Sequence, residues 1–233
     1  MNIWDPFHPF VYFVHTMLGG VGLLGALIAL SVTKGSSPHV LAGRAFAIAA
    51  SVVAATAILF SITSFAPMAV ASAAITLSAV GGALLALRNK TQKVAAGELA
   101  TTILMAAVVL WLLYGGVLSY SQGGLLWIPP LAFGAIAAAL FVNDLRFMKY
   151  DSNDREAKRL TRHLSRMAFA FSIAVHEPIV IFADRLSIHP ALAFYGPFIV
   201  WPVLFFSFNN RIKNNLLTLE TRLARGSAKR EVE

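Results

Sequence analysis

Seven long stretches of almost uniformly apolar residues are the feature that most constrains this chain. Each has about the 20 residues that a helix needs to cross the hydrocarbon core of a bilayer. The stretches run over Phe10–Thr33, His39–Ala66, Met68–Leu87, Gly97–Tyr120, Trp127–Lys149, His163–Leu186 and Ile188–Phe208. A membrane β-barrel would instead show segments of about ten residues with alternating polarity. Because these stretches are apolar on all sides, the sequence predicts an all-α membrane protein, a bundle of seven transmembrane helices.

The composition argues against a water-soluble fold. The chain is 58% hydrophobic and 13% charged, whereas a soluble domain is nearer to about 45–50% apolar and about 25% charged. The 233 residues include no cysteine, which excludes disulfides, thiolate zinc sites, iron–sulfur clusters and covalently attached c-type haem. We therefore expect one seven-helix domain over residues 1–233, with a short polar tail from about residue 210.

The basic residues predict how the bundle is oriented. All of the Lys and Arg residues except Arg185 fall in the loops and the tail at one end of the predicted bundle. Positive charge stays on the cytoplasmic side, so we expect the N-terminus outside and the C-terminus inside, in the inner membrane of a bacterium. The net charge of +8 then reflects topology and attraction to anionic lipid headgroups at the cytoplasmic face. It requires no nucleic-acid partner.

Four histidines lie at two levels of the predicted bundle. His15 and His176 fall in the outer halves of the first and sixth spans, and His39 and His163 fall at the cytoplasmic boundary of the second and sixth. Axial histidines on facing helices, at two depths, are the ligands of a di-haem b-type cytochrome. The sequence therefore suggests b-type haem with two histidine ligands, in a membrane protein that transfers electrons.

Basic residues near the cytoplasmic pair suit the acidic groups of such a cofactor. Arg44 and Arg166 are placed to pair with haem propionates. The whole cluster expected at this depth, as a site for propionates or anionic headgroups, comprises Lys34, His39, Arg44, Arg162, His163 and Arg166. Two simpler interpretations stay open. The shallow histidines could contact headgroups alone, and the glycines of the first span, including Gly19 and Gly22, could serve helix packing instead of a cofactor groove.

Two other classes of function remain. His15, His176 and Glu177 could bind Zn²⁺ with an open position for water, as in a metal-dependent hydrolase acting at the outer leaflet. Alternatively, the Ala- and Gly-rich helices and the small size suit a non-catalytic accessory subunit whose partners are other membrane proteins. The sequence does not decide whether the chain is an enzyme. We expect Asp144 and Arg146 to form an interfacial pair with little catalytic role.

Several motifs resemble a bacterial membrane family. His15 in the first span is followed by Lys34-Gly35 and by the pattern His39-x-x-x-Gly43-Arg44 that opens the second. This combination resembles the family DUF2306. Further pieces that agree are Asp144-Leu145-Arg146, His163-Leu164-Ser165-Arg166-Met167 and Tyr195-Gly196-Pro197 up to Trp201. The similarity covers roughly residues 8–210 and implies a multi-spanning fold. The family has no established activity, so the resemblance supplies no mechanism, and His176-Glu177-Pro178 departs from its pattern.

Overall fold

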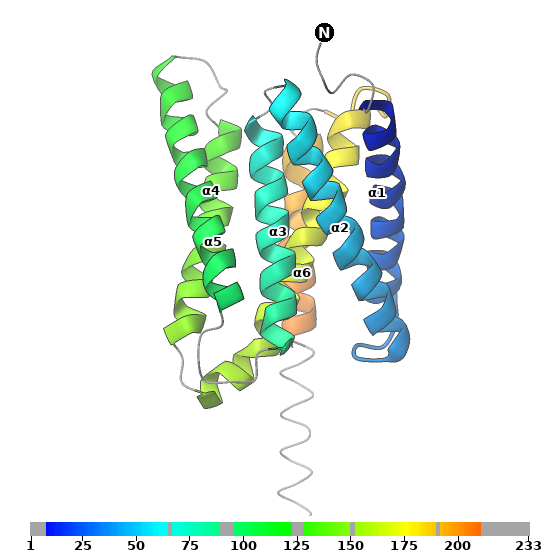
Figure 1. The fold of residues 1–233 in the computed structure, drawn as a ribbon, viewed down its shortest axis with the longest axis vertical. Helices are drawn as coiled ribbons and strands as arrows, with labels where there is room; N and C mark the ends of the chain where they lie inside the picture. Colours follow the sequence, from blue (N-terminus) through cyan, green and yellow to red (C-terminus); the bar gives the residue numbers. More distant parts are fainter. Residues whose placement is uncertain are drawn as a thin grey trace, which may run out of the picture.

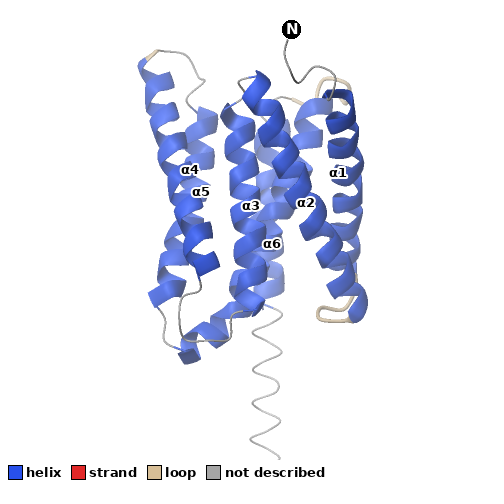
Figure 2. Cartoon of the chain, viewed as in Figure 1, coloured by secondary structure: helices blue, strands red, loops and turns tan. Residues whose placement is uncertain are grey.

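The computed structural model describes residues 8–64, 67–88, 96–122, 128–149, 152–189 and 192–210, and every regular element in these residues is a helix (Figures 1 and 2). The helices are α1 (His8–Ser31), α2 (Ser37–Ser64), α3 (Pro67–Arg88), α4 (Ala96–Ser121), α5 (Ile128–Lys149), α6 (Ser152–Phe182) and a last helix, Leu192–Asn210. Each of the seven predicted stretches overlaps one of them, although α6 begins at Ser152, 11 residues before the predicted start at His163. The predicted polar tail lies outside the described residues.

Six of the helices are long and apolar enough to cross a membrane, namely α1 to α5 and the last helix. The chain is therefore a multi-pass membrane protein. The exception is α6, because it begins with a charged segment and carries Arg166, His176 and Glu177 further along. The polar residues 152–162 form the first part of α6.

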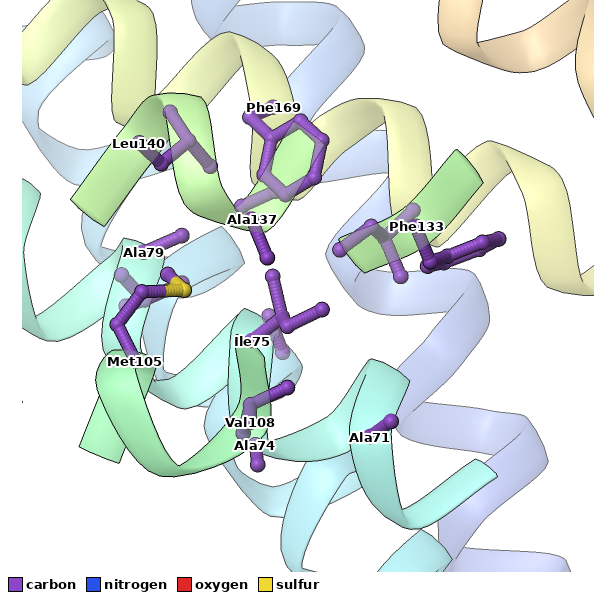
Figure 3. Close-up of a cluster of buried hydrophobic side chains, with 14 of the residues drawn as sticks. Ala71, Ala74, Ile75, Ala79, Met105, Val108, Phe133, Ala137, Leu140 and Phe169 are labelled. Carbon is purple, nitrogen blue, oxygen red and sulfur yellow. The ribbon is translucent and has the colours of Figure 1, made fainter. Parts of the chain in front are cut away.

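The centre of the bundle is α3, which packs against α2, α4 and α6. The α1–α2 hairpin and the α4–α5 hairpin lie on either side of it (Figure 1). Small buried side chains such as Ala79, Ala83 and Ser78 allow neighbouring helices to approach α3 closely, which is how helices associate in lipid. On one side of α3, Ile75 packs in a core with Met105 of α4 and other apolar side chains (Figure 3).

Two glycines of α1 serve helix packing. A Cβ atom on Gly25 would lie 3.0 Å from the carbonyl oxygen of Ala42 and 3.2 Å from the backbone nitrogen of Phe46, both in α2. A Cβ atom on Gly22 would likewise lie 3.2 Å from the Cβ atom of Ala49. Because any larger side chain would push α1 away from α2, this part of the glycine face is a helix contact and not a groove for a cofactor.

The turn between α1 and α2 explains the Lys-Gly pair of the sequence. The last carbonyl groups of a helix have no partner within it, and here the Lys34 ammonium donates to the carbonyls of Ala29 and Leu30, at 2.8 and 2.7 Å. Gly35 follows with φ of +81°, in the left-handed region that glycine adopts without strain. The turn thus ends α1 and leads directly into α2.

Candidate functional site

A cavity of about 1080 Å³ lies among α1, α2, α3, α6 and the last helix, beside the α1–α2 turn. Its polar lining residues are mainly His39, His163, Lys34 and Arg44, and most of its other walls are apolar. We call it the His39–His163 cavity. Its volume is slightly above the range of about 300–1,000 Å³ that is usual for ligand pockets. The two histidines, which the sequence placed at one depth on different helices, therefore share a single cavity.

Both imidazoles of the cavity are held by backbone carbonyls. His39 Nδ1 lies 2.9 Å from the carbonyl oxygen of Ala29, and His163 Nδ1 lies 3.1 Å from that of Ala83. A carbonyl oxygen only accepts hydrogen bonds, so each Nδ1 is the donor, and in the neutral ring the lone pair is then on Nε2. Histidines that ligate metals are oriented in this way.

The cations of the cavity differ in their surroundings. Lys34 donates to carbonyls of α1 and its ammonium nitrogen lies 4.6 Å from the centre of the Phe208 ring. Arg44 has an exposed side chain and, within the described part of the chain, no hydrogen-bond or ion-pair partner. Its guanidinium is therefore available to an anionic group at this end of the cavity.

A buried ion network lies on another side of α6. We use this name for Glu98 of α4, Asp144 of α5, and Arg162 and Arg166 of α6. Arg162 Nη2 lies 2.9 Å from Asp144 Oδ1 and its Nη1 lies 3.2 Å from Glu98 Oε1. Arg166 pairs with Asp144 Oδ2 and donates to the carbonyl of Leu140 at 2.9 Å. Exposure of the four side chains is 1–6%. Two cations thus neutralise two anions.

This network corrects three expectations. Arg162 and Arg166 were expected beside the cytoplasmic histidines, in contact with headgroups or propionates. Neither lines the His39–His163 cavity, because the helical positions of His163 and Met167 face the cavity while Arg162 and Arg166 turn toward α4 and α5. Asp144 was expected to pair with Arg146, but its carboxylate bonds to α6.

Glu98 was missed by the sequence analysis. The available signal was its place in the first turn of an apolar helix, since an acidic residue there is costly without a partner.

The outer histidines have different neighbours. His15 Nδ1 lies 2.8 Å from Thr56 Oγ1, and its ring meets the Phe60 ring edge-on at 5.8 Å between centres. Thr56 donates its hydroxyl hydrogen to carbonyls of its own helix, so it accepts from His15.

His176 is enclosed by phenylalanines. The ring centres of Phe133, Phe194 and Phe198 lie 5.7, 5.0 and 5.1 Å from the centre of the imidazole. Its nearest charged atom is Glu177 Oε1, 3.7 Å from Nδ1. Among the described residues, no three His, Asp or Glu side chains form a group that could hold a metal ion. His15, His176 and Glu177 are accordingly not brought together as a zinc site.

Comparisons with known proteins give no match: no family model, no curated protein and no solved structure is significantly similar to this chain. The resemblance to DUF2306 therefore stays a prediction. The function has to be argued from the geometry of the chain itself.

Proposed function

We propose that this protein binds a b-type haem between His39 and His163 and uses it for electron transfer. The observation that carries the proposal is that two imidazoles, from α2 and α6, line one cavity with each Nδ1 bonded to a carbonyl oxygen. This leaves Nε2 of both rings available as axial ligands. When bound, haem with two axial histidines supplies one-electron transfer.

The rest of the cavity fits the shape and charge of haem. Haem b is an amphiphile with an apolar ring and two carboxylates. The walls offer apolar surface from residues such as Phe46, Leu164 and Phe171, and the exposed Arg44 guanidinium lies at the same cavity. Arg44 therefore takes the propionate-binding role that the sequence assigned to Arg44 and Arg166 together. Anionic lipid headgroups are the competing ligands for this guanidinium, because they offer it the same charge.

The haem proposal is tested by the visible spectrum of the purified chain. We expect protein expressed with adequate haem supply to show a Soret band and, after dithionite reduction, the sharp α and β bands of a six-coordinate low-spin haem. Haem should be present at about one per chain. Protein that is folded yet colourless after haem supply contradicts the proposal. The interpretation as a non-catalytic accessory subunit would then remain. Bound phospholipid found by mass spectrometry in such protein would identify the headgroup interpretation.

We also propose that α6 crosses the membrane and that the cavity opens at the cytoplasmic side of a bacterial inner membrane. Support comes from the basic residues, because nearly all Lys and Arg fall in the loops and the tail at the same end of the bundle as the α1–α2 turn. The expected result is that a reporter fused after Glu233 reads as cytoplasmic and one inserted in the loop 121–126 reads as external. The same location for both reporters would contradict the proposal that α6 crosses, because α5 and the last helix alone would return the chain to the same side.

A further inference from the structure

We infer that the opposite end of the bundle contains a second binding site, for a single-ring compound with a hydroxyl group, and that His176 is its polar anchor. The inference does not depend on haem. It rests on two observations: a buried imidazole without partners, and a cavity one helical turn away from it.

The imidazole of His176 is not explained by packing. The residue is 4% exposed, and neither Nδ1 nor Nε2 has a hydrogen-bond partner among the described residues. Glu177 Oε1, at 3.7 Å from Nδ1, is beyond hydrogen-bond distance. A neutral imidazole carries one donor and one acceptor, and burying both without partners costs free energy. A phenylalanine would fill the same space at no such cost. An unsatisfied group of this kind calls for a ligand that satisfies it.

The cavity has a volume of about 320 Å³ and lies between α5, α6 and the last helix. His176 and the phenylalanines around it lie one helical turn away from this cavity. Three lining residues, Pro129, Val180 and Phe194, are each four positions along their helix from His176 or from one of its phenylalanine neighbours. Residues four apart share a helix face. The partners one turn away are Phe133, His176 and Phe198, respectively. The cavity therefore lies about one helical turn beyond the imidazole, which does not itself line it.

The ring of Phe194 lies between the cavity and the imidazole of His176. Its ring lines the cavity and also contacts His176, with 5.0 Å between ring centres. The side chain is half-buried at the edge of the core, where its ring contacts those of Phe133 and Tyr195, so a change of its rotamer displaces only contacts at that edge. Rotation of this one ring gives a molecule in the cavity access to the imidazole nitrogens.

The chemistry of the walls selects the ligand. The apolar and aromatic lining favours a flat ring that stacks against phenylalanine, and the volume, at the small end of ligand pockets, suits one ring. The imidazole offers a donor and an acceptor, which a hydroxyl group matches with its own donor and acceptor. The carboxylate of Asp184 also lines the cavity, which disfavours anions. A neutral phenol or hydroquinone-type ring fits all of these conditions.

The test compares phenol with benzene on the full-length protein in lipid nanodiscs. The two probes differ only in the hydroxyl group, and both partition into lipid, so the readout is the ¹⁵N signals of the His176 ring in histidine-labelled protein. We expect phenol to shift these signals with saturation, and benzene to bind at least about tenfold more weakly, the loss that follows when a buried polar group stays unpaired. His176→Phe removes the ring signals, so it is read by melting temperature: it should raise this temperature without ligand, and phenol and benzene should then shift it equally.

His15→Phe is the matched control, since it replaces the other outer histidine away from the cavity and should leave the preference for phenol intact. Ala193→Leu is the second variant: it keeps His176 but fills the cavity, so phenol should no longer shift its signals. The inference is overturned if phenol and benzene bind the wild type equally. It is also overturned if phenol leaves the His176 signals unchanged, as expected where a buried water already satisfies the ring.

Discussion

Replacing Asp144 with alanine should destabilise the protein more than any other single substitution in the ion network. Among the residues that the structure describes, Asp144 is the one carboxylate that bonds to both arginines. Among the described residues, its removal leaves Arg166 with the carbonyl of Leu140, and Arg162 with Glu98 and the face of the Phe147 ring. Breaking a buried ion pair by removing one partner costs on the order of 3–5 kcal/mol, because a buried charge is left uncompensated. The free energy of unfolding, measured by titration with a denaturing detergent in mixed micelles, should fall by about this amount.

The matched controls lie on the same helices. Arg146→Ala, at an exposed position two residues along α5, should change the free energy of unfolding by about 0–1 kcal/mol. Glu98→Gln should cost less than Asp144→Ala, because Arg162 keeps its shorter bond to Asp144. The double substitution of Asp144→Leu with Arg166→Met should recover part of the loss, since it removes charge of both signs. If Asp144→Ala and Arg146→Ala lower the free energy of unfolding equally, the ion network is contradicted and the pairing of Asp144 with Arg146 is favoured.

Replacing either His39 or His163 with alanine should abolish the low-spin haem spectrum. Each substitution removes one of the two axial ligands, so any haem that remains bound becomes five-coordinate and its reduced α band is lost. His163→Met separates ligation from folding, because a thioether can still ligate iron: this variant should keep haem and have a higher midpoint potential than the wild type. Optical redox titration measures both properties.

His15→Ala is the control for this series, because His15 bonds to Thr56 near the other end of α1. It should keep the full spectrum and the wild-type potential. If His15→Ala or His176→Ala removes the haem while His39→Ala retains it, the cofactor binds at the outer end and the proposed site is wrong.

The positions of the helices could be predicted closely from the sequence. The predicted stretch Met68–Leu87 corresponds to α3 at Pro67–Arg88, and Trp127–Lys149 corresponds to α5 at Ile128–Lys149. The physical reason is that bilayer thickness sets the length of a spanning helix, and the apolar stretch ends where the membrane does. The depth of a residue in the bundle could be predicted as well, from its position along its helix. His39 and His163 were expected at one level, and they line one cavity.

The rotation of each helix about its axis could not be predicted. In water, the apolar face of a helix indicates where the core lies, but a membrane helix is apolar all round and gives no such signal. For this reason Arg166 was expected beside His163 and lies instead against Asp144. His176 was likewise expected to face His15 and contacts phenylalanines of α5 and the last helix. These orientations depend on which helices are neighbours, and that is a property of the assembled bundle.

The carbonyl oxygen of Ala29 has a role that extends beyond ending α1. It accepts from both the Lys34 ammonium and His39 Nδ1, at 2.8 and 2.9 Å. Any electrophile that binds His39 Nε2 draws electron density from the ring and makes Nδ1–H a stronger donor, so the turn between α1 and α2 tightens as the cavity fills. By thermodynamic reciprocity, loosening that turn lowers the affinity of the cavity by the free energy that couples the turn to ligand binding. The turn that joins the first two helices is thus energetically coupled to ligand binding in the cavity.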